Sequence, residues 1–425
     1  MIVFRNCTIV DATSPEPREG QDVLVEDGRI REVSDTRIEV HGAWDVAVDG
    51  RTLMPGLIDA HAHVILGSYN PRQLEDIPPT LMTAQAARVM RGMLDRGFTS
   101  IRDAGGADWG LARAVEDGLL AGPRLFVSGR ALSQTGGHGD FRPRTRDAVE
   151  PCLCAHTLHF ASRIADGPEA VIAATRDELR KGASQIKVMA SGGIASPHDP
   201  LKRTQFSEEE LRAIVREATA WGTYVLAHAY TAEAAVHAVS CGVRSIEHGN
   251  LIDREAAAFM AAEGAYLVPT LATYEAMRRH GTDLNLSDAS QQKLKSVLEA
   301  GFSSIEYAME AGVPIGFGCD LLGPLHHMQH LELTLRTEVM SAHDVITAAT
   351  RTNATLLGRD DLGVIAPGAL ADILVVDGDP LNNFDVFDER GRNLPAIMKD
   401  GVFHKNQLTT TYREPQVAPA GPPVG

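Results

Sequence analysis

Residues 53–63, LMPGLIDAHAH, place two histidines at the end of an apolar run that is typical of a buried β-strand. Four later apolar runs also end on a residue that can bind a metal or hold a charge: QIKVMAS at Lys187, YVLAHAY at His228, SIEHGN at His248 and PIGFGCD at Asp320. Parallel (β/α)8 barrels gather the carboxyl ends of their strands around one site. The pattern therefore predicts a barrel in which these side chains meet.

Strand and helix signals alternate through residues 53–359, where eight strand candidates are each followed by a helical segment. One of these helical segments opens on Ser207 and Glu210, which have the spacing of a capping box. Such alternation indicates parallel strands joined by right-handed crossovers. An open doubly wound sheet would not bring the ends of strands one, four, five, six and eight together. We therefore expect an α/β fold with a TIM-like (β/α)8 barrel.

The two ends of the chain have a different pattern. Residues 1–52 and 360–407 contain short strand-like runs, with hairpin signals at Asp27-Gly28 and Asp400-Gly401. Two unrelated β extensions would leave exposed edges and poorly buried faces. We therefore expect the two ends to pair into one small β-sandwich domain, followed by a mobile Pro-rich tail at 408–425.

The composition is that of an ordinary globular protein: of 425 residues, 44% are hydrophobic and 23% are charged. Lys and Arg number 40 and Asp and Glu number 56, so the formal net charge is −16. This charge argues against non-specific binding to nucleic acid or anionic lipid. We expect neither nucleic acid nor a membrane as a partner, and the net charge does not identify a substrate.

The cysteines favour a reducing compartment. There are five of them, an odd number without regular spacing: Cys7, Cys152, Cys154, Cys241 and Cys319. Cys152 and Cys154 could bind a metal, but no second pair supports this, and two loop thiols are the preferred interpretation. Cys319 is expected to be a packing residue. No signal-peptide core and no apolar run of about 20 residues is present, so a cytoplasmic location is expected.

The residues at the strand ends suit a metal site. His61 and His63 are two apart and point to the same side of a strand, and imidazoles are good zinc ligands. Lys187 lies in an apolar run where a charged amine is costly to bury. It could pair with a buried carboxylate, or CO2 could carboxylate it to give an anionic ligand that bridges two cations. Singly, His228 or His248 could be a hydrogen-bonded core imidazole.

These motifs together resemble the amidohydrolase superfamily over nearly the whole chain. PGLIDAHAH, residues 55–63, is similar to the family's first-strand motif, and PGALADILVVDGDPL, residues 367–381, to the return into its β-sandwich. The resemblance implies hydrolysis by a hydroxide that bridges two divalent metal ions, which we expect to be Zn²⁺. Homo-oligomers are usual in this family, so we expect one here.

The resemblance also implies six metal ligands: His61, His63, Lys187, His228, His248 and Asp320. His61, His63 and Asp320 would bind the more buried ion. His228 and His248 would bind the more exposed one. Lys187, carboxylated by CO2, would bridge both. Asp320 would take the proton of the hydroxide and return it to the leaving nitrogen. Without the resemblance, Asp320 could be a cap residue at the start of a loop, since Asp is a good N-cap.

Within the superfamily the chain most resembles the Xaa-Pro dipeptidase, or prolidase-like, branch. The similar stretches are SGRALSQTGGHGD, KVMASGGIASPHDP, VLAHAYT and IEHGNLID. Tyr230 would face the same site as His228 and could donate to an oxyanion, although a packing tyrosine at the barrel rim is an alternative. His138 could hold the terminal carboxylate of the substrate, and a structural loop histidine is an equal alternative.

Two loops are expected to line the substrate pocket, GSYNPRQLED at 67–76 and SGGIASPHDPLKR at 191–203. Five of their residues are candidates for selectivity: Tyr69, Asn70, His198, Lys202 and Arg203. A further cluster, His326, His327 and His330, is interpreted as surface or helix-start histidines because the ligand set is already complete.

The sequence thus predicts a metal-dependent hydrolase of amide bonds in small substrates. A dipeptidase that cleaves Xaa-Pro or related dipeptides is the first hypothesis. The alternative is a carboxy-amide hydrolase that acts on N-acyl amino acids or on aryl amides such as ochratoxin-type mycotoxins. A cyclic-amide hydrolase and a non-catalytic scaffold are less favoured, the scaffold because no metal ligand is missing.

Overall fold

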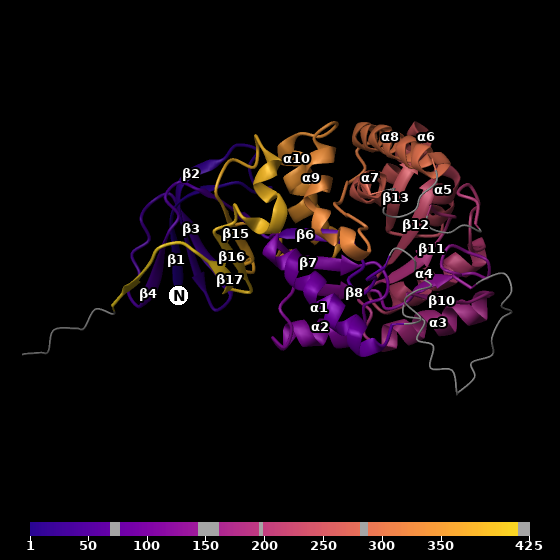
Figure 1. The fold of residues 1–425 in the computed structure, drawn as a ribbon, viewed down its shortest axis with the longest axis horizontal. Helices are drawn as coiled ribbons and strands as arrows, with labels where there is room; N and C mark the ends of the chain where they lie inside the picture. The colour runs from indigo at the N-terminus through magenta and orange to yellow at the C-terminus, as the bar shows by residue number, and fades with distance from the viewer. Residues whose placement is uncertain (69–76, 143–160, 195–198, 281–287, 415–425) are drawn as a thin grey trace, which may run out of the picture.

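The computed structural model describes residues 1–68, 77–142, 161–194, 199–280 and 288–414. Five residues named above lie outside the described residues: Tyr69, Asn70, Cys152, Cys154 and His198. Figure 1 shows an elongated molecule in which strands from both ends of the chain lie together, beside a larger part where helices surround parallel strands. Among the described helices, none is long and apolar enough to cross a membrane.

The larger part contains two parallel sheets. A three-stranded sheet has the order β6 (Leu57–Ala62), β7 (Phe98–Asp103), β8 (Arg124–Val127). A six-stranded sheet has the order β10 (Ser162–Ile164), β9 (Ala131–Ser133), β11 (Ile186–Met189), β12 (Val225–Thr231), β13 (Ser245–Leu251), β14 (Tyr266–Val268). The predicted α/β class with parallel strands is confirmed.

Helices follow the strands as the sequence predicts. They are α1 (Pro79–Asp95), α2 (Trp109–Glu116), α3 (Pro168–Arg180), α4 (Glu208–Ala220), α5 (Ala232–Ser240), α6 (Arg254–Ala262), α7 (Leu271–Arg279), α8 (Asp288–Ala311), α9 (His330–Arg336), α10 (Ala342–Thr347) and α11 (Asn353–Leu356). A π-helical turn at Ala348–Thr352 joins the last two, and short 3₁₀ turns span Gly323–Met328, Phe384–Phe387 and Glu389–Gly391. The capping box of Ser207 and Glu210 is present at the start of α4.

The eighth predicted strand, in PIGFGCD, is not a regular strand. Residues 314–320 instead make two backbone hydrogen bonds to each neighbour, among them Gly316 N–H to Leu267 O at 2.8 Å and Ala60 N–H to Phe317 O at 2.8 Å. An added Cβ at Gly318 would lie 2.6 Å from His61 Cβ. The segment therefore passes too close to β6 for a side chain at residue 318, which explains why a glycine interrupts the strand pattern here.

Strands from the two ends of the chain pair in one sheet, as predicted. The nine-stranded sheet has the order β17 (Val402–Asn406), β16 (Ala396–Lys399), β15 (Ile373–Val376), β5 (Thr52–Pro55), β1 (Ile2–Ile9), β2 (Arg18–Glu26), β3 (Arg29–Ser34), with β4 (Ala43–Ala47) beside β1 and β18 (Thr410–Arg413) beside β4. The hairpins at Asp27-Gly28 and Asp400-Gly401 are also confirmed, since all four residues have positive φ, as a tight hairpin turn needs.

The predicted tail at 408–425 begins too early. Thr410–Arg413 forms β18, which pairs antiparallel with β4, and residues 415–425 lie outside the described residues. The Tyr412 ring lies 5.1 Å from that of Trp44, and Arg413 Nε donates to Asp45 Oδ2 at 2.6 Å. These cross-strand contacts stabilise the strand, and they involve partners more than 360 residues away in sequence.

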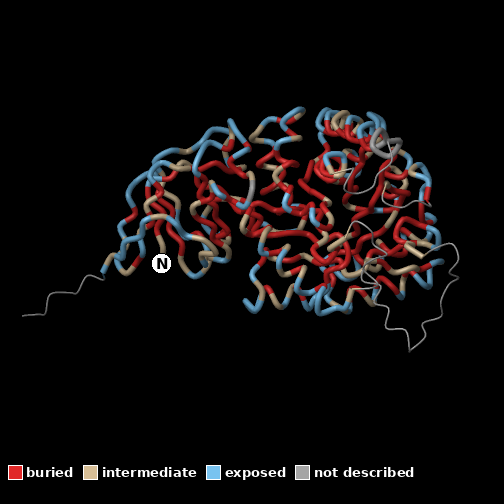
Figure 2. Tube along the Cα trace, viewed as in Figure 1, coloured by how far each residue is buried: buried red, intermediate tan, exposed pale blue. Residues whose placement is uncertain are grey.

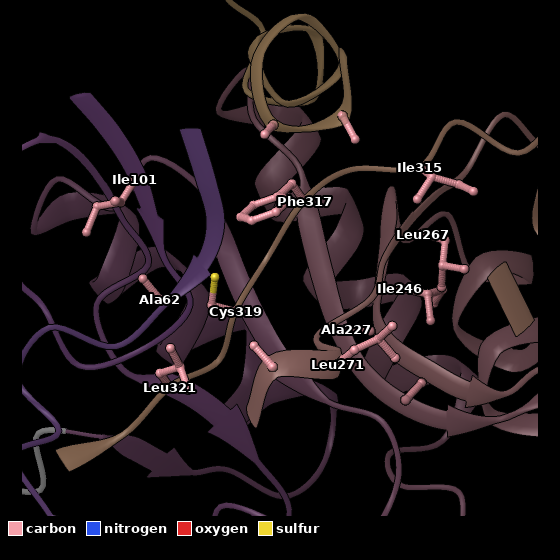
Figure 3. Packing of buried hydrophobic residues seen from close by; sticks show 14 of the residues in the cluster. Ala62, Ile101, Ala227, Ile246, Leu267, Leu271, Ile315, Phe317, Cys319 and Leu321 are labelled. Atoms are coloured by element: carbon pink, nitrogen blue, oxygen red, sulfur yellow. The ribbon is translucent and has the colours of Figure 1, made fainter. Parts of the chain in front are cut away.

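The core follows the strands. Buried residues line the two parallel sheets, whereas the outer helix faces are exposed (Figure 2). Figure 3 shows part of the large apolar cluster, with Ala62 and Ile101 on one side of the view, Leu267 on the other and Phe317 between them. Cys319 is buried in this cluster as a free thiol, so its interpretation as a packing residue is confirmed. This packing holds the strand ends, and the polar residues on them, in fixed positions.

Candidate active site

Three of the predicted ligands form a compact group at the end of β6. One ligand atom from each of His61, His63 and Asp320 lies within 4.8 Å of the others. Asp320 Oδ1 is 3.6 Å from His61 Nε2 and 3.3 Å from His63 Nε2. Parallel strands end at the same edge of the sheet, which explains how residues 61 and 320 come together.

His228 and His248 complete a cluster of imidazoles. The ring centroids of His61 and His248 are 4.9 Å apart, and those of His228 and His248 are 4.6 Å apart. Lys187 is almost fully buried, and its charge acts on His61, His63, His228 and His248. All six sequence-predicted ligands therefore lie in one region.

Hydrogen bonds to Nδ1 prepare three of the histidines for a ligand at Nε2. His63 Nδ1 is 2.8 Å from Gly105 O, which can only accept, so this nitrogen holds the proton. His61 Nδ1 is 2.7 Å from Glu247 Oε2, and His248 Nδ1 is 2.7 Å from Thr270 Oγ1. Such partners fix the tautomer and orientation of metal-binding histidines.

His228 has the opposite arrangement. Its Nε2 is 3.3 Å from Gly192 O, which leaves Nδ1 with a free lone pair. All four imidazoles can therefore offer one ring nitrogen to a metal while the other ring nitrogen is held. The donor set of four imidazoles, one carboxylate and one buried amine fits a divalent ion such as zinc.

Burial keeps three of the four histidines neutral; it would also lower the pKa of His63, but the Asp320 carboxylate outweighs burial there and raises that pKa. Burial lowers the pKa of His248 to about 3 and the pKa values of His61 and His228 well below their usual range, so these rings are neutral. It lowers the pKa of Lys187 to about 8. Burial would raise the pKa of Asp320, but its histidine neighbours outweigh this and hold the pKa below the usual value.

Backbone strain also marks the site. His248 and Asp320 have φ of 73° and 52°, in the left-handed region that residues other than glycine rarely adopt. Such strain collects at functional sites, where surrounding packing holds it in place. Gly249, after His248, has a φ of 59°, and an added Cβ would lie 2.5 Å from Leu267 Cδ1, so a side chain here would be strained.

A buried ion pair lies behind His61. The side chains of Arg102 and Glu247 are both 0% exposed, and Arg102 Nη2 donates to both carboxylate oxygens of Glu247 at 2.8 Å. Ser245 Oγ donates to the same carboxylate at 2.7 Å. The sequence analysis missed both charged residues. The signal was present, because FTSIRD and SIEHGN each place a charge inside an apolar run, as at Lys187.

Replacing Glu247 with glutamine should destabilise the fold by about 3–5 kcal/mol, because Arg102 would keep a buried charge without a counter-charge. Urea unfolding of the metal-free protein measures this. The control is Glu116→Gln, since Glu116 pairs with Arg113 on the surface, and we expect a change there within about 0.5 kcal/mol. Equal stability of the two variants would contradict a structural role for the pair.

Both predicted substrate residues reach the site. The His138 ring stacks on that of His228 with centroids 4.3 Å apart, and its Nδ1 is 3.0 Å from Asp199 Oδ2. The Tyr230 ring stacks on that of His248 with centroids 5.2 Å apart.

The remaining candidates have mixed outcomes. Lys202 and Arg203 are exposed on the loop after β11. His327 is exposed and His330 begins α9, as expected, but the surface interpretation is wrong for His326, which is 5% exposed. His326 lies in a 3₁₀ turn whose buried face packs into the core, and burial lowers its pKa to about 3.

The chain belongs to the amidohydrolase family, whose model matches residues 52–403. Among solved structures, an amidohydrolase is 50% identical, with a TM-score of 0.91 over 95% of this chain and 99% of that one. A prolidase complexed with N-methylphosphonate-L-proline is 46% identical, with a TM-score of 0.91 over 96% of this chain and 100% of that one. Ochratoxinase of Aspergillus niger is 32% identical, over 83% of this chain and 75% of that protein. The resemblance to prolidase-like amidohydrolases is confirmed.

Proposed function

We propose that this amidohydrolase cleaves the amide bond of small substrates that end in a carboxylate, and that Xaa-Pro dipeptides are its preferred substrates. The observation that supports this most directly is the group of His61, His63 and Asp320, whose ligand atoms lie within 4.8 Å of one another. The 46% identity to a prolidase over nearly the whole chain supports the substrate class.

The scaffold we propose is a closed (β/α)8 barrel over residues 53–359, with a β-sandwich domain built from 1–52 and the C-terminal strands from residue 360 onward. The hydrogen bonds of residues 314–320 to both β14 and β6 support closure on that side. The β18–β4 pairing extends the C-terminal part beyond the sequence-based limit of residue 407.

We propose two divalent metal ions, taken to be Zn²⁺, held by the six clustered side chains, with Lys187 carboxylated between them. The imidazoles and their held ring nitrogens support this ligand set, and burial lowers the pKa of Lys187 to about 8, which increases the share of neutral amine, the form that reacts with CO2. When bound, the ions would supply a lowered water pKa and polarisation of the carbonyl.

Asp320 is the proposed proton shuttle. Its carboxylate is ionised and lies between His61 and His63 at the centre of the group. It would accept a proton from the attacking water and pass it to the nitrogen that leaves, as general base and then general acid. The left-handed backbone at Asp320 aims the side chain at this point.

Tyr230 is the proposed donor to the oxyanion that forms on the carbonyl oxygen. Its ring is stacked on His248 beside the ligand cluster. Tyr230→Phe should lower kcat by about 10²-fold, the effect of removing one such donor, and leave metal content and KM nearly unchanged. Steady-state kinetics and metal analysis on the same sample measure both. An unchanged kcat would remove Tyr230 from this role.

His138 is the proposed partner of the substrate carboxylate. Asp199 holds its Nδ1, so Nε2 can face the substrate. The ring lies against Gly193, where an added Cβ would be 2.2 Å from His138 Cε1. Gly193→Ala should therefore displace the ring and raise KM by about 10-fold or more for carboxylate substrates. A substrate with a C-terminal amide is the control, and an equal rise in its KM would contradict this role.

The proposed function is tested by hydrolysis of Xaa-Pro dipeptides, N-acyl amino acids and ochratoxin A by protein supplied with zinc and bicarbonate. We expect Xaa-Pro dipeptides to have the highest kcat/KM. The 32% identity to ochratoxinase favours a second candidate, an aryl-amide hydrolase, and a preference for ochratoxin A would establish it instead. No hydrolysis by metal-loaded protein would refute both.

A further inference from the structure

Two buried hydroxyl groups outside the ligand set connect His248 to Tyr230. His248 Nδ1 is 2.7 Å from Thr270 Oγ1. The Thr270 side chain lies near enough to the phenol of Tyr274 to lower its pKa, and the Tyr274 hydroxyl is 2.6 Å from the Tyr230 hydroxyl. All four residues are buried. The four side chains therefore form a path of neighbouring buried polar groups, with a hydrogen bond at each of its two ends.

The direction of donation follows from one end of this path. If Nε2 of His248 is reserved for a ligand, a neutral ring has its only N–H at Nδ1 and donates it to Thr270. The Thr270 hydroxyl then donates to the oxygen of Tyr274, and the Tyr274 hydroxyl donates to the oxygen of Tyr230. The hydrogen of Tyr230 is left without a partner in this path and is free for a substrate oxygen.

We propose that Thr270 and Tyr274 are positioning residues that orient the hydroxyl of Tyr230 toward the oxyanion. This inference rests on the proposed function, because it assigns Tyr230 the role given above. Without Tyr274, the Tyr230 oxygen would no longer accept a hydrogen bond from that residue, and the Tyr230 hydroxyl could rotate. A donor fixed before the reaction needs no reorganisation when charge develops on the substrate.

The surrounding structure holds this path rigid. Thr270 lies just before α7, and the first turn of α7 is fixed by Ala272 N–H, which donates to Glu332 Oε2 at 2.6 Å. Arg336 pairs with Glu332 and donates to Pro269 O at 2.9 Å. The turn that presents Thr270 is thus tied to α9 by buried charged groups. The rings of Tyr230 and His248 are stacked with 12° between their planes.

The test of Tyr274 uses the affinity of the zinc-loaded protein for N-methylphosphonate-L-proline, whose tetrahedral phosphonyl group stands in for the oxyanion. Tyr274→Phe should weaken this affinity by about 10-fold, the effect of one hydrogen bond, with zinc content and the affinity for L-proline unchanged. Tyr230→Phe and the double variant Tyr230→Phe/Tyr274→Phe should weaken it equally, since Tyr274 acts only through Tyr230.

The matched control is Tyr266→Phe, which removes a hydroxyl at the start of β14, the strand that leads to Thr270. This variant should bind the phosphonate as the wild type does. An undiminished phosphonate affinity in Tyr274→Phe, or additive losses in the double variant, would overturn the inference. A lower melting temperature in Tyr274→Phe without a change in phosphonate affinity would show a merely structural role.

The test of Thr270 uses zinc affinity, measured by competition with a chelator. Thr270→Val keeps the shape but removes the acceptor for His248, so zinc affinity should fall about 10-fold and phosphonate affinity should fall with it. Thr270→Ser, which restores the hydroxyl, should recover both. Full zinc and phosphonate affinity in Thr270→Val would overturn the inference that Thr270 and Tyr274 orient Tyr230, an arrangement we call the relay.

These affinities need no turnover, so the two proposals can fail separately. A wild type that cleaves no amide but shows the expected pattern of affinities would refute the proposed substrates and leave the relay in place. If the wild type cleaves Xaa-Pro dipeptides and Tyr274→Phe keeps full phosphonate affinity, the proposed substrates stand and the relay is refuted. A metal-loaded wild type that does not bind the phosphonate would overturn the relay.

Discussion

Asp320→Asn should lower kcat for amide hydrolysis by at least about 10³-fold, the upper part of the range for losing a general acid–base group. Asparagine keeps the shape of the side chain and can still offer an oxygen toward His61 and His63, but it cannot take up a proton at neutral pH. It also tolerates the positive φ of 52° at this position. The loss should therefore come from chemistry and not from the backbone.

Steady-state kinetics, the circular dichroism spectrum and zinc content of the purified variant check this result. Asp27→Asn is the control, because Asp27 also has a positive φ, 50°, but lies in the exposed hairpin between β2 and β3. It should retain full activity. A kcat for Asp320→Asn within tenfold of the wild type, with zinc retained, would mean that another group moves the proton.

The clustering of the candidate ligands could be predicted from the sequence because each is a polar residue inside or at the end of an apolar run. His61, Lys187, His228 and His248 lie on β6, β11, β12 and β13, and the topology of parallel strands brings such ends together. No long-range information was needed. The pairing of the two chain ends was also predictable, because each end alone has unpaired strand edges.

Other features depend on contacts between segments that the sequence does not connect. Tyr274 lies in α7 and contacts Tyr230 on β12, and α7 shows no polar signal that would single it out. The strand at Thr410–Arg413 exists because β4 offers it an edge. His326 looks like one of three surface histidines in sequence, and only the packing of its turn buries it.

The irregular backbone of the eighth predicted strand also depends on a contact between segments that are distant in the sequence. PIGFGCD has the composition of a strand, and its end does supply Asp320. The close approach of Gly318 to His61, however, comes from the packing of residues 314–320 against β6. A glycine in a strand pattern can mark such an approach, but the partner on the other side becomes visible only in the structure.

Lys187→Ala should remove nearly all turnover and also lower the amount of bound metal. Lys187 is 1% exposed, and among the charged groups that act on it are Glu247 and Asp320. Alanine at this position leaves a cavity at the centre of the cluster and no group that CO2 can carboxylate. If the carboxylated amine joins the two metal ions, its loss removes a ligand from both, and their affinities should fall together.

Metal content per subunit after dialysis, together with kcat, measures this effect. Labelling with ¹³C-bicarbonate gives a readout that does not depend on activity, since a carbamate carbon should appear in the NMR spectrum of the wild type and be absent from the variant. Acetate added at high concentration should enter the cavity and restore part of the metal binding, because it supplies the missing carboxylate without the amine.

Lys181→Ala is the matched control, since Lys181 lies at the end of α3, just before β11, and is partly exposed beside Asp177. It should keep its metal, its label and its turnover. A Lys187→Ala protein with two metal ions and normal turnover would contradict a bridging lysine. Loss of turnover with full metal content and no carbamate in the wild type would instead favour a buried, uncarboxylated amine that acts through its charge.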